Sequence, residues 1–75
     1  METEYVELAL ATAIAQAGLP ADVTEIAQSD PRLGGVLKRG MDEVQGKSVI
    51  VQRLKVNSIV NWYVRILAKE VKAVS

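Results

Sequence analysis

Polar and hydrophobic positions recur at helical spacing over the last third of the chain. From Lys47 onward there is no Gly or Pro, and the polar residues step by three, six, four, four and three, which keeps them on one helical face. These polar residues are Gln52, Lys55, Asn61, Arg65, Lys69 and Lys72. The opposite stripe consists of Val49, Val56, Val60, Tyr63, Leu67, Val71 and Val74, with Ile59 and Ile66 beside it. The pattern predicts a helix of about 26 residues, ~39 Å long.

The first part of this segment also has the composition of a strand. Residues 48–56 are rich in β-branched side chains, which favour extended structure. Strict alternation fails, however, because Val49, Ile50 and Val51 are consecutive hydrophobic residues. We therefore expect a helix that includes residues 49–57, with a strand as the alternative for this part only.

The N-terminal segment predicts another apolar helix, over residues 4–17. Alanines alternate there with larger aliphatic residues, and only two side chains of residues 8–17 are polar. A helix this apolar around its circumference needs neighbours on more than one side. Gly18 suits the position after a helix end, and Pro20 cannot extend the helix.

A capping box predicts the start of a short helix over residues 23–28. Asp22 is the expected N-cap, and Glu25 lies at the capping-box position three residues later. Asp30 is the expected cap of the next helix. Pro31 suits the first position of that helix, where its missing N–H costs nothing.

A weaker helix is predicted over residues 32–44. Its apolar residues recur at spacings of three and four, and they are Leu33, Val36, Leu37, Met41 and Val44. Gly34, Gly35 and Gly40 each cost about 1 kcal/mol relative to Ala, which indicates a flexible or tightly packed stretch. Gly46 is a second candidate for the position after a helix end.

Together these segments predict an all-α fold with one domain over residues 1–75. We expect a small bundle of three or four helices, in which the long C-terminal helix and the apolar N-terminal helix pack as a hairpin. A core of this size is marginal alone, and the chain has no Cys for disulfides and no His or Cys for zinc. Because 49% of the residues are hydrophobic, part of the apolar surface is expected to lie against a partner.

No segment predicts a membrane span. The longest uncharged run, residues 8–21, has 14 residues, whereas a spanning helix needs about 20. The acidic first residues differ from the basic start of a signal peptide. We therefore expect a soluble protein, with the cytoplasm as the default location and secretion or virion assembly as open alternatives.

The charges are sorted along the sequence. Residues 1–30 carry six acids and no Lys or Arg, a net charge of −6, whereas residues 31–75 carry nine bases and three acids, a net charge of +6. The two parts should attract each other, either within one molecule or between molecules. Attraction between molecules would be head-to-tail and would give a ring or a filament, whereas attraction within one hairpin would leave a symmetric dimer as the expected oligomer.

Candidate chemistry is sparse. The chain lacks His and Cys, the commonest general base and the commonest strong nucleophile. Asp42 and Glu43 are adjacent, and on a helix such neighbours point about 100° apart, so they do not converge on one substrate. We expect no enzyme activity, no cofactor and no metal.

Trp62 and Tyr63 form the only aromatic pair. Tyr63 falls within the apolar stripe of the long helix, so it is expected in the core. Trp62 lies off that stripe, which favours an intermolecular contact because large amphipathic rings are frequent interface anchors.

A helix-turn-helix that binds DNA is the main alternative. Residues 21–28 would form its first helix, and residues 33–45, with Lys38 and Arg39, would form the recognition helix. The basic C-terminal segment agrees with contact to phosphates. The zero net charge, the adjacent acids at positions 42 and 43, and the three glycines of this helix oppose it.

The layout of residues 29–75 also resembles the needle and inner-rod subunits of type III secretion systems. The resemblance depends on Ser29-Asp30-Pro31 as a turn between helices and on the C-terminal Lys69-Glu70-Val71-Lys72-Ala73-Val74. It implies a short helical subunit whose C-terminal helix packs into a filament. The chain departs from this family in lacking an N-terminal Trp and in having additional glycines.

The function expected from these features is non-catalytic. The chain would self-assemble, or dock as a small subunit on a helical protein partner. The residues expected to supply the interface are Leu8, Leu10, Ile14, Ile59, Trp62, Ile66 and Leu67. The residues expected to steer association by charge are Glu4, Glu7, Arg65, Lys69 and Lys72.

Overall fold

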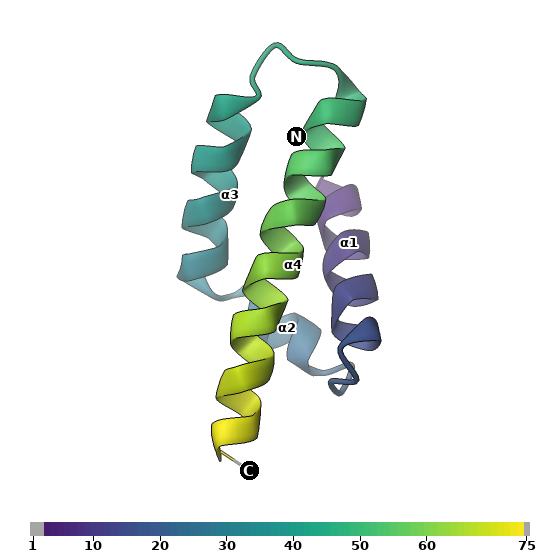
Figure 1. The fold of residues 1–75 in the computed structure, drawn as a ribbon, viewed down its shortest axis with the longest axis vertical. Coiled ribbons are helices and arrows are strands. Elements are labelled where there is room, and N and C mark those ends of the chain that lie inside the picture. The colour runs from purple at the N-terminus through teal and green to yellow at the C-terminus, as the bar shows by residue number, and fades with distance from the viewer. Residues whose placement is uncertain (1–2, 75) are drawn as a thin grey trace.

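The computed structural model describes residues 3–74, without the side chain of Val74. It consists of four helices: α1 (Thr3–Gln16), α2 (Val23–Gln28), α3 (Pro31–Glu43) and α4 (Val49–Val74) (Figure 1). The predicted all-α bundle is confirmed, and so is the 26-residue C-terminal helix. The alternative of a strand at residues 48–56 is wrong, because α4 begins at Val49.

Helix α4 is the centre of the bundle, and α1 and α3 pack along its length (Figure 1). Helix α3 runs antiparallel to α4, since Arg32 contacts Glu70 and Glu43 contacts Lys55. Helix α1 runs parallel to α4, and near its start the hydroxyl of Tyr5 donates a hydrogen bond to the side chain of Asn57.

The predicted packing of the C-terminal helix against the N-terminal helix is confirmed, but their arrangement as a hairpin is wrong, because the two helices are parallel. The turn through α2 reverses the chain between α1 and α3, and the loop at residues 44–48 reverses it again between α3 and α4. Two reversals return α4 to the direction of α1. The antiparallel hairpin of this fold is instead formed by α3 and α4.

The core lies where the inner faces of the helices meet on α4. Its most deeply buried large side chains are Leu10, Ile14, Val60 and Tyr63, so the predicted place of Tyr63 is confirmed. The two remaining helices complete it through Ala27 of α2, which is fully buried, and Leu33 of α3. The opposite face of α1 is exposed, so in the monomer this helix has no neighbour on its outer side among residues 3–74.

The helix ends follow the sequence signals in most places. Gly18 and Gly46 have φ values of 74° and 82°, which L side chains rarely adopt, and each follows the end of a helix. The carboxylate of Asp30 accepts a hydrogen bond from the backbone N–H of Arg32 at 2.9 Å, with Pro31 at the first position of α3. The predictions for Gly18, Asp30 and Pro31 are confirmed. Gly46 has the expected left-handed backbone, but it lies two residues after the cap at Val44, so it turns the loop and does not end the helix.

The predicted cap at Asp22 is wrong. Asp22 has helical dihedral angles (φ −66°, ψ −18°), and its side chain makes no capping hydrogen bond. The chain already turns at Pro20, whose carbonyl accepts a hydrogen bond from the N–H of Val23. The N–H groups of Thr24 and Glu25, which a capping side chain at position 22 would bind, donate instead to the carbonyls of Ala21 and Asp22.

Gly40 is the point of closest approach between α3 and α4. A Cβ atom at this position would overlap Cδ1 of Ile59 and would lie 3.2 Å from Cε of Lys55. Around Gly34 and Gly35, by contrast, a Cβ atom would meet open space. Tight packing thus accounts for Gly40 but not for Gly34 or Gly35.

Candidate interaction surfaces

A polar cluster joins the start of α3 to the second half of α4. The hydroxyl of Tyr63 donates a hydrogen bond of 2.7 Å to Oδ2 of Asp30. Nη2 of Arg32 lies 2.8 Å from the same oxygen and 3.0 Å from Oε1 of Glu70. The guanidinium of Arg32 also lies over the Tyr63 ring, 6.0 Å from its centre.

The charges of this cluster are mutually stabilised. Hydrogen bonds from Arg32, and then from Tyr63, hold the pKa of Asp30 far below its ordinary value of 3.8. Burial, together with the bond to Asp30, raises the pKa of Tyr63 to about 12. Every group in the cluster has a partner within it, so we assign the cluster a structural role in fixing α3 on α4.

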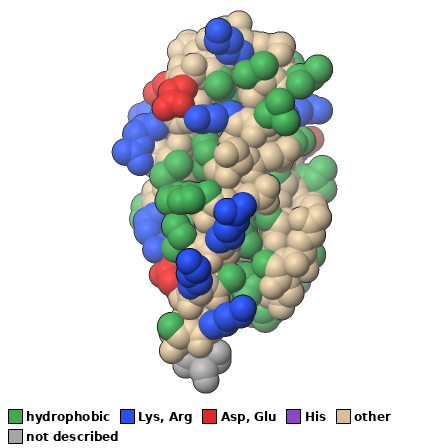
Figure 2. Space-filling view, viewed as in Figure 1, with side chains coloured by type: hydrophobic (Ala, Val, Ile, Leu, Met, Phe, Trp, Pro, Cys, Tyr) green, Lys and Arg blue, Asp and Glu red, His purple; other side chains and the backbone are tan. Residues whose placement is uncertain are grey.

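The first turns of α4 carry a group of exposed aliphatic side chains, which we call the apolar overhang. It consists of Val49, Ile50, Val51 and Leu54, which are 55%, 72%, 40% and 62% exposed. Since Tyr5 is level with Asn57, α4 extends about two turns beyond the start of α1. Figure 2 shows hydrophobic side chains gathered at this end of the molecule.

Sequence reasoning did not place the overhang in the interface. Val49 belonged to the stripe predicted to face the core, and the other three residues were assigned no role. One signal was present, because the consecutive hydrophobic residues at positions 49–51 cannot all lie on one stripe of a helix.

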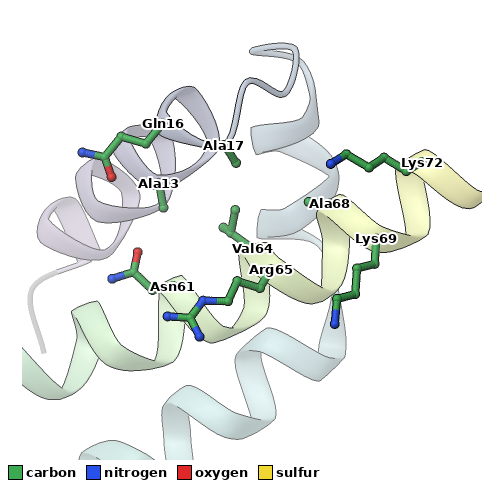
Figure 3. A pocket seen from close by; sticks show the side chains of 9 residues that line it. All are labelled: Ala13, Gln16, Ala17, Asn61, Val64, Arg65, Ala68, Lys69 and Lys72. Atoms are coloured by element: carbon green, nitrogen blue, oxygen red, sulfur yellow. The ribbon is translucent and has the colours of Figure 1, made fainter.

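A groove of about 550 Å³ runs between α1 and the second half of α4 (Figure 3). Its floor consists of small side chains, Ala13, Ala17 and Ala68, together with Val64. Three cations, Arg65, Lys69 and Lys72, line its α4 side, and the amides of Gln16 and Asn61 lie at one end. We call it the basic groove.

The cations of the basic groove do not converge on one point. Figure 3 shows Lys72 extending toward α1, whereas Lys69 points away from it. The guanidinium of Arg65 lies toward Asn61. An isolated small anion needs several donors at one place, so this arrangement suits an elongated acidic surface better than a single phosphate.

A shallower groove of about 430 Å³ lies on the other side of α4. Trp62 is 47% exposed and lines it, with Val36, Arg39, Ser58 and Ile59. The ring therefore lies off the core stripe, as predicted. Its intermolecular contact stays a prediction.

The residues predicted to form the interface divide into two sets. Leu8 is 64% exposed and Trp62 is exposed, whereas Ile66 is half-buried. The other four, Leu10, Ile14, Ile59 and Leu67, are between 1% and 7% exposed. These four side chains are buried in the core of the monomer, so they expose almost no surface that a partner could contact.

The residues predicted to steer association lie on two helices, the acids on α1 and the bases on α4. Glu4 and Glu7 are exposed near the start of α1, and among residues 3–74 neither forms an ion pair. Because α1 is parallel to α4, Arg65 and Lys72 lie about 12 and 22 Å further along the axis than the level of Tyr5. The sorted charges thus form an acidic flank on α1 and α2 and a basic face on α4, rather than a neutralised hairpin.

The two helices of the predicted helix-turn-helix correspond to α2 and α3, which contact each other. Lys38 and Arg39 are exposed on α3, and Asp42 is exposed on the same helix. Arg32, just before the supposed recognition helix at residues 33–45, is held by Asp30 and Glu70. DNA binding stays a prediction.

Residues 3–74 contain no group of three or more acidic side chains placed to hold a metal ion. No helix within the same range is long and apolar enough to cross a bilayer.

The chain matches no protein-family model, no curated protein and no solved structure. The resemblance of residues 29–75 to needle and inner-rod subunits therefore stays a prediction from the Asp-Pro turn and the C-terminal helix. Function must be inferred from the surfaces described above.

Proposed function

We propose that the protein is a non-catalytic assembly subunit that associates with copies of itself through the apolar overhang. The observation that carries this proposal is the exposure of Val49, Ile50, Val51 and Leu54, between 40% and 72%, on two successive turns of one helix. Contiguous apolar patches on a small protein are typical of interaction sites.

A second copy is the favoured partner because the four side chains of the overhang are uncharged, while the guanidinium of Arg53, on the same two turns, lies over the ring of Tyr5, 4.8 Å from its centre. A patch of aliphatic side chains can pack against itself without like-charge repulsion, as a symmetric interface requires. The parallel α1 also stops short of this end, so a second α4 could approach from the side that α1 leaves uncovered.

The free energy available from the overhang is modest. Full burial of a Leu, Ile or Val side chain contributes about 1.5–3 kcal/mol, and these four side chains have roughly half to two thirds of that still to gain. Two copies together could gain roughly 6–16 kcal/mol, against an association cost of about 4–15 kcal/mol. We therefore expect a concentration-dependent equilibrium.

The test compares the wild type with the double variant Ile50→Gln/Leu54→Gln. Gln is a good helix former, so the change removes apolar surface and leaves α4 intact. At high salt, which screens contacts between charged surfaces, sedimentation velocity from low micromolar to near-millimolar protein should show the wild-type mass rising above the monomer, while the double variant stays monomeric.

The matched control is Ile26→Gln on α2, which removes a side chain of similar exposure, 62%, at a distant site. It should associate like the wild type. A wild type that stays monomeric at every concentration would overturn the proposal, and so would equal loss of association in the control. Circular dichroism of each variant establishes that the helices are retained.

A further inference from the structure

We propose that the basic groove receives the outward face of α1 from a second copy, so that copies join head to tail. The inference rests on the proposed function only in taking a second copy as the partner. The two surfaces that it joins, the outward face of α1 and the basic groove, are distinct from the overhang. They are complementary in charge, and the parallel packing of α1 on α4 holds them apart within one molecule.

The inserting face is the first half of α1. Glu4 and Leu8 lie one helical turn apart on its exposed side, and Glu7 lies beside Leu8. Leu8 is 64% exposed, although it is a large aliphatic residue in the middle of a helix. The face therefore combines one apolar knob with two carboxylates and carries no base.

The receiving face has the complementary chemistry. Ala13, Ala17 and Ala68 give the basic groove a floor of small side chains, which lets an incoming helix approach closely. Arg65 lines its α4 side and Lys69 lies at the outer edge of that side, pointing away from α1, so a helix seated on the groove would bring the carboxylates beside Leu8 close to both.

The fold prevents both faces from being satisfied within one molecule. The start of α1 is level with Asn57, so Arg65 lies about 12 Å further along α4. The contact must be made between copies, and it joins two different surfaces. Each added copy leaves one face of each kind open, so the product is a ring or a chain of copies.

A charge-swap experiment tests the pairing. One variant carries Glu4→Lys and Glu7→Lys, and the other carries Arg65→Glu and Lys69→Glu. Both are made in the Ile50→Gln/Leu54→Gln background, so that association through the overhang does not contribute. At low salt the background protein should associate, and each charge variant alone should bind its own copies about tenfold or more weakly.

An equimolar mixture of the two charge variants is the decisive sample. It should regain association, because each acidic face then meets a basic one, and added salt should reverse the gain. The control variant Glu25→Lys, which reverses an exposed acid on α2, should behave like the background protein. A mixture that associates no better than its components would overturn the pairing, even if the overhang contact is confirmed.

Cross-linking gives a second measurement that does not require charge reversal. Since the chain has no Cys, Leu8→Cys and Ala68→Cys molecules can be prepared separately and mixed under oxidising conditions. The mixed disulfide should form faster than with an Ile26→Cys partner. Equal rates for both partners would contradict the proposed contact.

The same variants distinguish a nucleic-acid ligand. A short mixed-sequence DNA duplex is added to the background protein at low salt and followed by gel shift. The proposal expects no retention that depends on Arg65 and Lys69. Retention that is lost in the Arg65→Glu/Lys69→Glu variant, without recovery in the mixture, would assign the groove to nucleic acid instead.

Discussion

Replacing Tyr63 by Phe would remove one hydroxyl group from the best-defined tertiary contact of this fold. The hydroxyl donates to Oδ2 of Asp30 at 2.7 Å, and the residue is 1% exposed. Phe keeps the ring in the core and keeps the guanidinium of Arg32 over it. The substitution therefore isolates the hydrogen bond between α4 and the start of α3.

The expected loss follows from the partners that remain. A hydrogen bond to a charged group contributes about 1.5–3 kcal/mol. Asp30 still accepts bonds from the backbone N–H of Arg32 on Oδ1 and from Nη2 of Arg32 on Oδ2, so neither oxygen is left unpaired. We therefore expect the lower part of that range, about 1.5–2 kcal/mol. In a domain of this length the thermal midpoint should fall by roughly 6–16 °C.

The assay is urea unfolding followed by circular dichroism, at a protein concentration where the mass is that of the monomer. Tyr5→Phe is the matched control, because it also removes a single hydroxyl, here one that donates to the neutral amide of Asn57 at 3.0 Å. Tyr5 is only half-buried, so this control should lose less than about 1 kcal/mol.

Alkaline pH provides an independent measure of the same contact. The pKa of Tyr63 is raised to about 12 from the ordinary 10.0. The folded state thus holds the phenolic proton more tightly, and this contribution is complete below pH 10 and is lost as the pH rises toward 12. Two pKa units correspond to about 2.7 kcal/mol. Because Arg32 and Glu70 are about half exposed, water screens the cluster, and we expect roughly half of that figure.

The difference between wild type and Tyr63→Phe is the quantity to follow, because the other tyrosine and the lysines ionise in both proteins. The stability gap should narrow as the pH rises. Two results would refute the reasoning: a Tyr63→Phe protein as stable as the wild type at neutral pH, or a gap that stays constant through the alkaline range.

Three further predictions concern α3 and its caps. Gly40→Val should lower the free energy of unfolding by about 1–3 kcal/mol, because the new side chain overlaps Ile59. Gly34→Ala should raise the free energy of unfolding by up to about 1 kcal/mol, because the new methyl group meets open space and Ala favours the helix. Equal urea midpoints for the two variants would contradict this. Asp30→Ala should lower the thermal midpoint by far more than Asp22→Ala, since only Asp30 caps a helix and accepts the bond from α4; scanning calorimetry of both variants gives the comparison. The depressed pKa of Asp30 means that its contribution is complete above pH 3.8 and is lost as the pH falls below that value. Acid titration should therefore unfold the wild type over a range where Asp30→Ala shows a shallower dependence, and parallel curves would argue against the assignment.

The positions of the helices could be predicted because their signals are local. The stripe of α4, the cap at Asp30 and the helix end at Gly18 each depend on residues within a turn or two. Asp22 shows the limit of such signals. Its sequence fits a capping box, yet the N–H groups of Thr24 and Glu25, which its side chain was expected to bind, donate to backbone carbonyls of the preceding turn.

The sequence by itself determined that this is a helical bundle, where each helix lies and which side chains share a face, because helical periodicity and capping are properties of neighbouring residues. Only the tertiary structure decided that α1 runs parallel to α4, that α1 begins level with Asn57, and that the first turns of α4 stay exposed. Periodicity states which residues lie together on a helix, but it carries no information about how far the neighbouring helix extends or in which direction it runs. The same stripe is therefore core at Val60 and surface at Val49.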